Sequence, residues 1–277
     1  MKLISPVSIR LFLPAFLLMA WLQNPLAAQP SSAFAYQPGK VTPGTLVQYV
    51  KSNLDGSKPS LITMYIADAD CIEVYKSEKG LIDAADVIAR MDWSRFSFAH
   101  LDGGVVTRSG KRESRATVTL EKDKLLVKIG TVSDELTVSV FPVHVYNFDL
   151  MSLNVTLPYL KNPAFDFQFS IVEPTFRSSP PLVEDRGSVL AKYVKAEKFD
   201  GIDTWRYEVR GKGMKDQLSQ LWINQSDGFL QKWESPVPNN PGWNSLKLVR
   251  QSQGKMNRDE WNEYKKSNIG TGMPAQK

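Results

Sequence analysis

Strict alternation of apolar and polar residues is the feature that most restricts how this chain can fold. In the run FDFQFSI, Phe165, Phe167, Phe169 and Ile171 alternate with polar residues, and WRYEVR, ELTVSV and RATVTLE repeat the pattern. Because successive side chains of a strand point to opposite faces, each run predicts a strand with one buried and one solvent-facing side. The chain is therefore expected to be mainly β, with antiparallel strands.

Turn sequences separate these runs and predict hairpins. They are LDGSKPS, LDGG, RSGKR, EKDK, FDGID and QSDGF. Asp-Gly pairs tolerate the positive φ angles of tight turns, so we expect about eleven or twelve strands, many joined as hairpins.

Two segments have helical spacing instead. FDLMSLNVTLPYL (148–160) predicts a short helix, and NRDEWNEYKKSN near the end predicts another, with Asn257 as N-cap and Glu260 completing a capping box. GLIDAADVIARMDW fits a helix or a strand, and we favour a strand.

The first 28 residues have the order of a secretory signal peptide. The basic residues Lys2 and Arg10 precede an apolar run over residues 11–22. Small residues then lead to a cleavage site near Ala28. A retained membrane anchor is the alternative. No later apolar run is long enough to span a membrane, so we expect an exported, periplasmic protein without a transmembrane span in its mature chain. Cys71 is the sole cysteine, which excludes an internal disulfide.

The predicted layout has five parts. Residues 1–28 form the signal peptide, 29–44 an extended lead-in, 45–175 an N-terminal β-rich half, 176–186 a proline-rich loop, and 187–277 C-terminal hairpins with the terminal helix. The mature part is long enough for one large β domain or two small ones.

Charge and motifs exclude several functions. The net charge of +5 falls to +3 without Lys2 and Arg10, which is too weak and unclustered to predict a nucleic-acid partner. His100 and His144 are the two histidines, and neither has metal-ligand spacing or a nucleophile motif beside it. We therefore predict no catalytic residue, no metal site, no cofactor and no enzyme activity.

Tryptophans concentrate in the C-terminal half. Each offers a large apolar face with one N–H to satisfy, and at strand positions such rings are usually core. If they line a cavity instead, its ligand is apolar. The candidate ligand-binding residues are Trp205, Trp222, Trp233 and Trp243, and Lys232 is expected on the wet face beside Trp233.

The segment from Gly187 to Arg250 resembles the LolA/LolB lipoprotein carriers and their uncharacterised relatives. The resemblance is carried by a strand ending in LWIN, the SDG turn, the returning strand LQKWES and the NPG corner. It implies a curved antiparallel sheet or half-barrel with one or two short helices and an apolar concave face. Lipid or lipoprotein is the partner that this resemblance implies.

Two functions stay open from the sequence. The first is an exported protein that binds an apolar ligand, lipid or lipidated partner on its curved sheet. The second is a structural or envelope-assembly protein that contacts other envelope proteins and binds no small molecule. A cavity of ligand size would favour the first.

Overall fold

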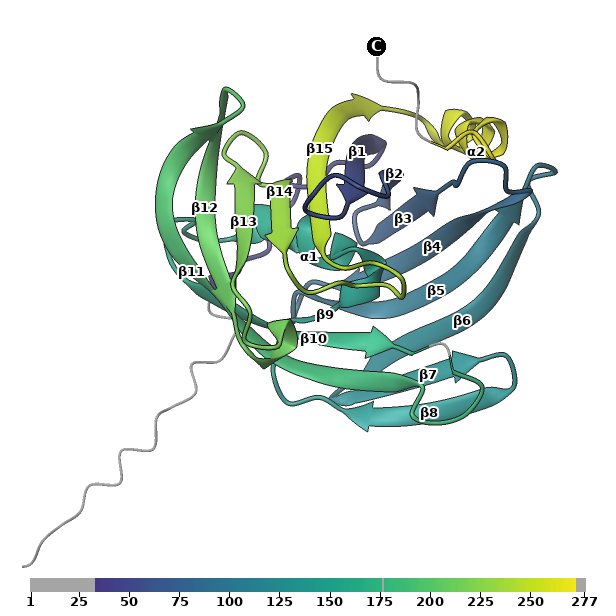
Figure 1. Ribbon diagram of the computed structural model, residues 1–277, viewed down its shortest axis with the longest axis horizontal. Coiled ribbons are helices and arrows are strands. Elements are labelled where there is room, and N and C mark those ends of the chain that lie inside the picture. The colour runs from purple at the N-terminus through teal and green to yellow at the C-terminus, as the bar shows by residue number, and fades with distance from the viewer. Residues whose placement is uncertain (1–32, 176, 273–277) are drawn as a thin grey trace, which may run out of the picture.

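A single curved sheet of 15 strands dominates the computed structural model (Figure 1), which describes residues 33–175 and 177–272. The strand order across the sheet is β8-β7-β6-β5-β4-β3-β2-β1-β15-β14-β13-β12-β11-β10-β9. The strands are β1 (Thr45–Ser52), β2 (Ser60–Asp68), β3 (Cys71–Lys76), β4 (Asp83–Asp92), β5 (Ser97–Thr107), β6 (Arg112–Glu121), β7 (Lys124–Ile129), β8 (Val132–Thr137), β9 (Val143–Val145), β10 (Phe167–Pro174), β11 (Val183–Phe199), β12 (Ile202–Arg210), β13 (Ser219–Asn224), β14 (Leu230–Ser235) and β15 (Leu246–Lys255).

Hairpins build both wings of this sheet, and its first and last strands join them in the middle. β1 pairs antiparallel with β15, so that Val50 faces Val249. The neighbouring pairs are antiparallel except β9 and β10, which run parallel. The expected mainly β fold with a curved, essentially antiparallel sheet is confirmed.

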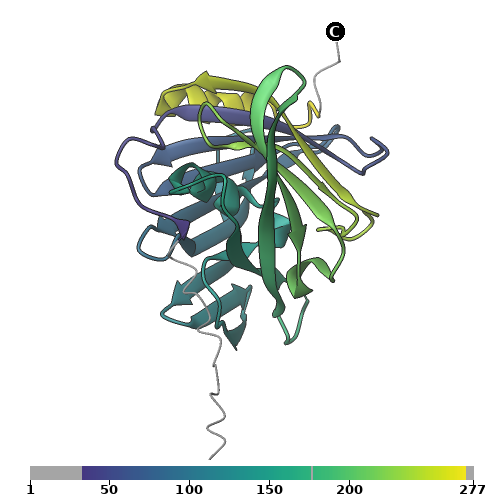
Figure 2. The same cartoon turned by 90° about the vertical axis from the view of Figure 1, so that its left-hand side faces the viewer.

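The sheet curls around a short helical segment on its concave face (Figure 2). This segment consists of η2 (Tyr146–Phe148), α1 (Met151–Thr156) and η3 (Leu157–Tyr159), and every residue of α1 is buried. Asn154 fixes α1 to both wings: its amide nitrogen donates to the Tyr49 hydroxyl at 2.9 Å, and its oxygen accepts from the Leu230 backbone N–H at 2.8 Å. The helix predicted over 148–160 is therefore present, and it fills much of the concavity.

The second helix, α2 (Arg258–Ser267), covers the opposite, convex face of β1–β4. The capping box between Asn257 and Glu260 is formed as predicted. The Trp261 ring is fully buried and stacks on Tyr65 with ring centroids 4.9 Å apart. Among the described residues no helix is long and apolar enough to cross a membrane.

Several expectations differ in detail from the structure. The described residues form fifteen strands instead of eleven or twelve, partly because β9 has three residues, too few to show alternation. β11 begins at Val183, so the connection from β10 is shorter than the expected loop 176–186. The segment GLIDAADVIARMDW contains β4, as favoured. The predicted signal peptide lies outside the described residues.

Candidate functional site

An open cavity of about 550 Å³ lies on the concave face of β1–β6, beside η2. Its volume falls within the range of about 300–1,000 Å³ that small-molecule sites occupy. Six strands, the β3–β4 connection, η2 and the β14–β15 loop contribute to its lining: Lys51, Ser60, Lys76, Glu78, Ala85, Val87, Gly103, Gly104, Val105, Arg115, Ala116, Asn147, Asn240, Pro241 and Trp243.

The cavity exists because small residues meet across three neighbouring strands. Gly103 of β5 faces Val87 of β4 on one side and Ala116 of β6 on the other. A Cβ atom at Gly103 would meet nothing nearer than the Ala116 carbonyl oxygen at 3.7 Å. Further along β5 the same face carries Phe98, which is fully buried in the core. The floor is therefore apolar and recessed.

A β-bulge brings a cation to the edge of this floor. Gly103 pairs with Ala116 and Gly104 pairs with Ser114, which leaves Arg115 as the extra residue on β6. Successive residues of a regular strand face opposite sides, but a bulge re-aims them. Arg115 and Ala116 accordingly both line the cavity. The Arg115 side chain is 61% exposed, and its Nη2 lies 3.5 Å from Asp83.

Two lysines and one buried aspartate form the charged end of the cavity. Lys51 Nζ lies 2.9 Å from Asp149 Oδ1, and Lys76 pairs with Asp149 Oδ2. Burial would raise the pKa of Asp149, but the two ammonium groups outweigh burial and hold that pKa well below its ordinary value. Burial lowers the pKa of Lys51, against the opposing attraction of Asp149. Asp149 is therefore ionised, and each of its oxygens pairs with one of these lysines.

The loop between β14 and β15 roofs the same end. Trp243 lies over Lys51, whose Nζ is 4.5 Å from the centre of the ring. Asn239 anchors the loop by donating to Asp149 Oδ1 at 2.8 Å, and the Asn53 side-chain oxygen accepts from the Asn244 backbone N–H at 3.0 Å. This is the wide proline corner expected from the sequence, and the structure folds it over the sheet.

The four tryptophan candidates occupy different places. Trp243 lines the cavity described above, and Trp205 lines a separate hollow of about 460 Å³ beside η3. Trp222 is buried on the convex face, where its indole N–H donates to Glu197 at 2.8 Å. Trp233 is fully buried in the main core. The structure does not bring them together around one space.

Neither histidine lines this cavity, and the two histidines have different hydrogen-bond partners. His100 shares a hydrogen bond of 2.9 Å with the Thr119 hydroxyl, and His144 shares one of 3.2 Å with Ser152. Burial lowers the pKa of His144 to about 3, so its ring is neutral. Cys71 is buried, and burial raises the pKa of its thiol. Among residues 33–175 and 177–272, no group of three potential metal ligands occurs.

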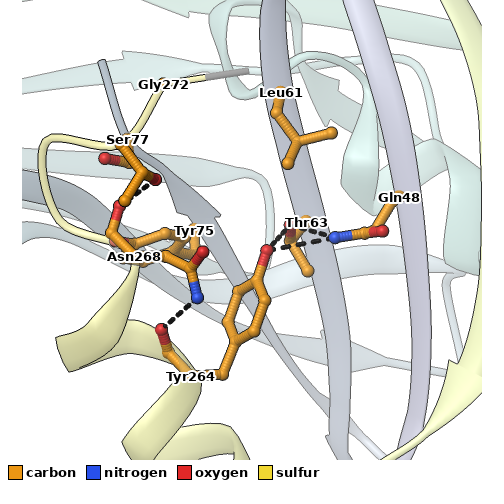
Figure 3. Close-up of a pocket in the computed structure, with 9 residues that line it drawn as sticks. Gln48, Leu61, Thr63, Tyr75, Ser77, Tyr264, Asn268 and Gly272 are labelled. Atoms are coloured by element: carbon orange, nitrogen blue, oxygen red, sulfur yellow. Dashed lines mark hydrogen bonds between the residues drawn. The ribbon is translucent and has the colours of Figure 1, made fainter. Parts of the chain in front are cut away.

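A smaller hollow of about 200 Å³ lies under α2 on the convex face (Figure 3). The Tyr264 hydroxyl points into it and lies 3.0 Å from Gln48 Nε2 and 3.1 Å from the Thr63 hydroxyl. Asn268 is turned back, donating to the Tyr264 carbonyl at 2.8 Å. The side chains satisfy one another, and the volume is below the usual ligand range. We interpret this hollow as part of how α2 docks.

Sequence reasoning missed most of the cavity. No sequence motif marks Lys51, Lys76, Arg115 or the small residues of the floor. These residues come together only through strand register. The prediction of a turn at LDGG is wrong, because Gly103 and Gly104 lie inside β5. A glycine in a strand often marks a bulge or a space, and this was the one local signal of the cavity.

The comparisons with known proteins add little to this geometry. No family model and no curated protein matches the chain. Among solved structures, a LolA superfamily protein from Nitrosomonas europaea aligns over 82% of this chain and 90% of its own, with 12% identity and a TM-score of 0.25. At that level nothing about function follows from the likeness, and the chain is not assigned to a family.

Proposed function

We propose that this chain is an exported, periplasmic protein that binds a ligand with an apolar body in the cavity on β1–β6. The observation that supports the proposal is the cavity itself. It has ligand-like volume and an apolar floor, and it lies on a concave face much of which is filled by the protein's own side chains. Carriage of a lipid or lipidated partner is the role that suits such a site best.

Binding is tested with a neutral fluorescent probe such as Nile red. We expect saturable binding to the purified protein. Ala85→Leu places a larger side chain on the cavity floor and is expected to weaken binding about tenfold or more, because it removes the space. The matched control is Thr117→Leu on β6, which enlarges a side chain on the opposite face of the sheet. Equal loss in both variants, or no saturable binding, contradicts the proposal.

Export is tested separately. Expression of the full chain in a Gram-negative host should yield a periplasmic product whose N-terminal sequence begins near Gln29. An intact N-terminus on a membrane-bound product would contradict this part and support a retained anchor.

The alternative, an envelope-assembly protein without a small-molecule ligand, has one observation in its favour. Most of the concave face is filled by α1, η2 and buried rings such as Tyr146 and Trp233. Mass spectrometry of organic extracts distinguishes the two. A binding protein purifies with lipid that Ala85→Leu loses, whereas an assembly protein carries none in either form.

A further inference from the structure

The charged end of the cavity is not neutral. Lys51 and Lys76 both pair with Asp149, and their side chains are 5% and 21% exposed, while that of Asp149 is fully buried. One carboxylate balances one ammonium, so these three side chains together retain one positive charge. Glu78 also acts electrostatically on Lys51 but forms no ion pair with either lysine. A partly buried positive charge in excess is stabilised when a group of opposite sign binds beside it.

The excess charge faces the empty space. Lys51 and Lys76 line the cavity together with Arg115, and Glu78 is the one acidic residue among its lining side chains. Arg115 reaches the cavity only because of the bulge in β6. Arg115 is already paired with Asp83, so the positive charge left for a ligand of opposite sign is that shared by Lys51 and Lys76.

Lys76 is the better placed of the two lysines to meet a ligand. The Trp243 ring covers the Lys51 ammonium, and Lys51 is almost fully buried. Lys76 keeps a fifth of its side chain exposed, and an ammonium group has three donors, of which Asp149 occupies one direction. Lys51 and Lys76 share the single carboxylate of Asp149, so part of their combined positive charge stays unpaired, and Lys76 carries the exposed part.

We infer that the ligand is a single-chain amphiphile with an anionic head, a long-chain carboxylate whose head binds at Lys76 and whose chain lies on Ala85, Gly103 and Ala116. This inference rests on the proposed function and adds the class of ligand. A volume of about 550 Å³ suits one apolar chain and not a two-chain lipid. The anionic head of the ligand binds at the cationic end of the cavity, and its apolar chain packs on the recessed floor.

The test compares decanoate with decanol, two molecules of equal chain length that differ in charge, below their micelle-forming concentrations. Calorimetric titration should show decanoate binding about tenfold more tightly, since a hydrogen bond to a charged group contributes about 1.5–3 kcal/mol. Added salt should weaken the binding of decanoate and leave the binding of decanol unchanged. Acetate, which has the head without the chain, should bind far more weakly than decanoate.

Lys76→Gln is the informative variant. It is expected to weaken decanoate about tenfold and to leave decanol binding as it is, because the floor is untouched. Lys128→Gln, on the opposite face of β7, is the matched control and should change neither affinity. Circular dichroism checks that both variants are folded. If Lys76→Gln does not fold, the salt dependence of the unmodified protein decides.

The outcomes separate the inference from the proposed function. Equal affinity for decanoate and decanol overturns the anionic head and leaves apolar binding intact. Acetate binding as tightly as decanoate overturns the amphiphile, because the chain would then contribute nothing. Binding of neither decanoate nor decanol removes the proposed function and the inference together.

Discussion

Trp233 shows how the C-terminal tryptophans divide between core and surface. Its ring is fully buried, and its indole N–H has no hydrogen-bond partner among the described residues. Trp233→Ala should lower the free energy of unfolding by about 3–5 kcal/mol, because truncating a buried ring leaves a cavity. Trp233→Phe should cost much less, since it keeps most of the apolar volume and removes the unpaired N–H. Denaturant titration measures both.

The control for that prediction has to be chosen from the structure. Lys232, expected on the wet face, is only 15% exposed, and its Nζ lies 4.6 Å from the centre of the Phe199 ring and 4.7 Å from that of Trp222. Its removal therefore costs packing and cation–π attraction. Lys192→Ala on β11 is exposed and should change stability by less than about 0.5 kcal/mol. A Trp233→Ala protein as stable as Lys192→Ala would refute the core assignment.

His144 makes stability depend on pH in a defined window. In the folded protein its pKa is lowered from 6.5 to about 3, because the ring is buried. Below about pH 6.5 the unfolded chain takes up a proton that the folded protein does not, so stability is complete above that pH and falls as pH drops toward 3. At pH 5 the loss is about 2 kcal/mol.

The variant His144→Gln tests this dependence. Urea titrations at pH 7, 6 and 5 should show a shallower loss of stability in the variant, whatever its absolute stability. The pKa values of Glu73 and Asp149 are lowered in the folded protein, so their contribution to stability is lost mainly at more acidic pH. These two groups therefore change stability little between pH 7 and pH 5. Parallel pH profiles for variant and parent would contradict the assignment to His144.

Among the elements, α2 depends on one buried carboxylate. Glu73 of β3 accepts hydrogen bonds from Trp261 Nε1 at 2.6 Å, from Lys265 Nζ at 2.8 Å and from Arg258. Burial would raise the pKa of Glu73, but these donors outweigh it and hold the pKa below its ordinary value. The carboxylate is therefore the point to which the helix is tied.

Glu73→Gln should release α2 from the sheet. Losing the charge leaves Lys265 buried without its main partner, and breaking a buried pair typically costs about 3–5 kcal/mol. Hydrogen exchange across 258–267 should accelerate markedly. The matched control is Glu263→Gln on the same helix, where the side chain is 68% exposed and pairs with Lys266 at 3.4 Å. Unchanged protection of α2 in Glu73→Gln would show that aromatic stacking alone holds it.

Elements whose signal is local were predictable. Alternation gave the strands such as β10 and β12, and the Asn257–Glu260 box gave the start of α2. The cavity was not predictable, since it depends on which strands become neighbours. The cavity floor combines Val87, Gly103 and Ala116 from three strands, which become neighbours through strand register. Trp243, much later in the chain, lines the same cavity. Small residues also carry no chemistry that a motif search detects.

At the scale of the molecule, the two halves expected from the sequence share one sheet and one core. β1 pairs with β15 along its length, and the Tyr49 hydroxyl, which accepts from Asn154, donates to the Leu230 carbonyl at 3.0 Å. One side chain thus links β1, α1 and β14. Separating the halves would expose the edge of β1 and the buried face of α1.

We therefore expect one cooperative unfolding transition, with equal calorimetric and van't Hoff enthalpies in differential scanning calorimetry. Tyr49→Phe removes the shared hydroxyl and leaves the Leu230 carbonyl and the Asn154 amide without it, which should cost about 1–3 kcal/mol. Because the link is common to both wings, the whole transition should move to lower temperature without splitting. Two transitions, of which Tyr49→Phe shifts only one, would mean that the wings fold as separate units and that the interface between β1 and β15 contributes little to either.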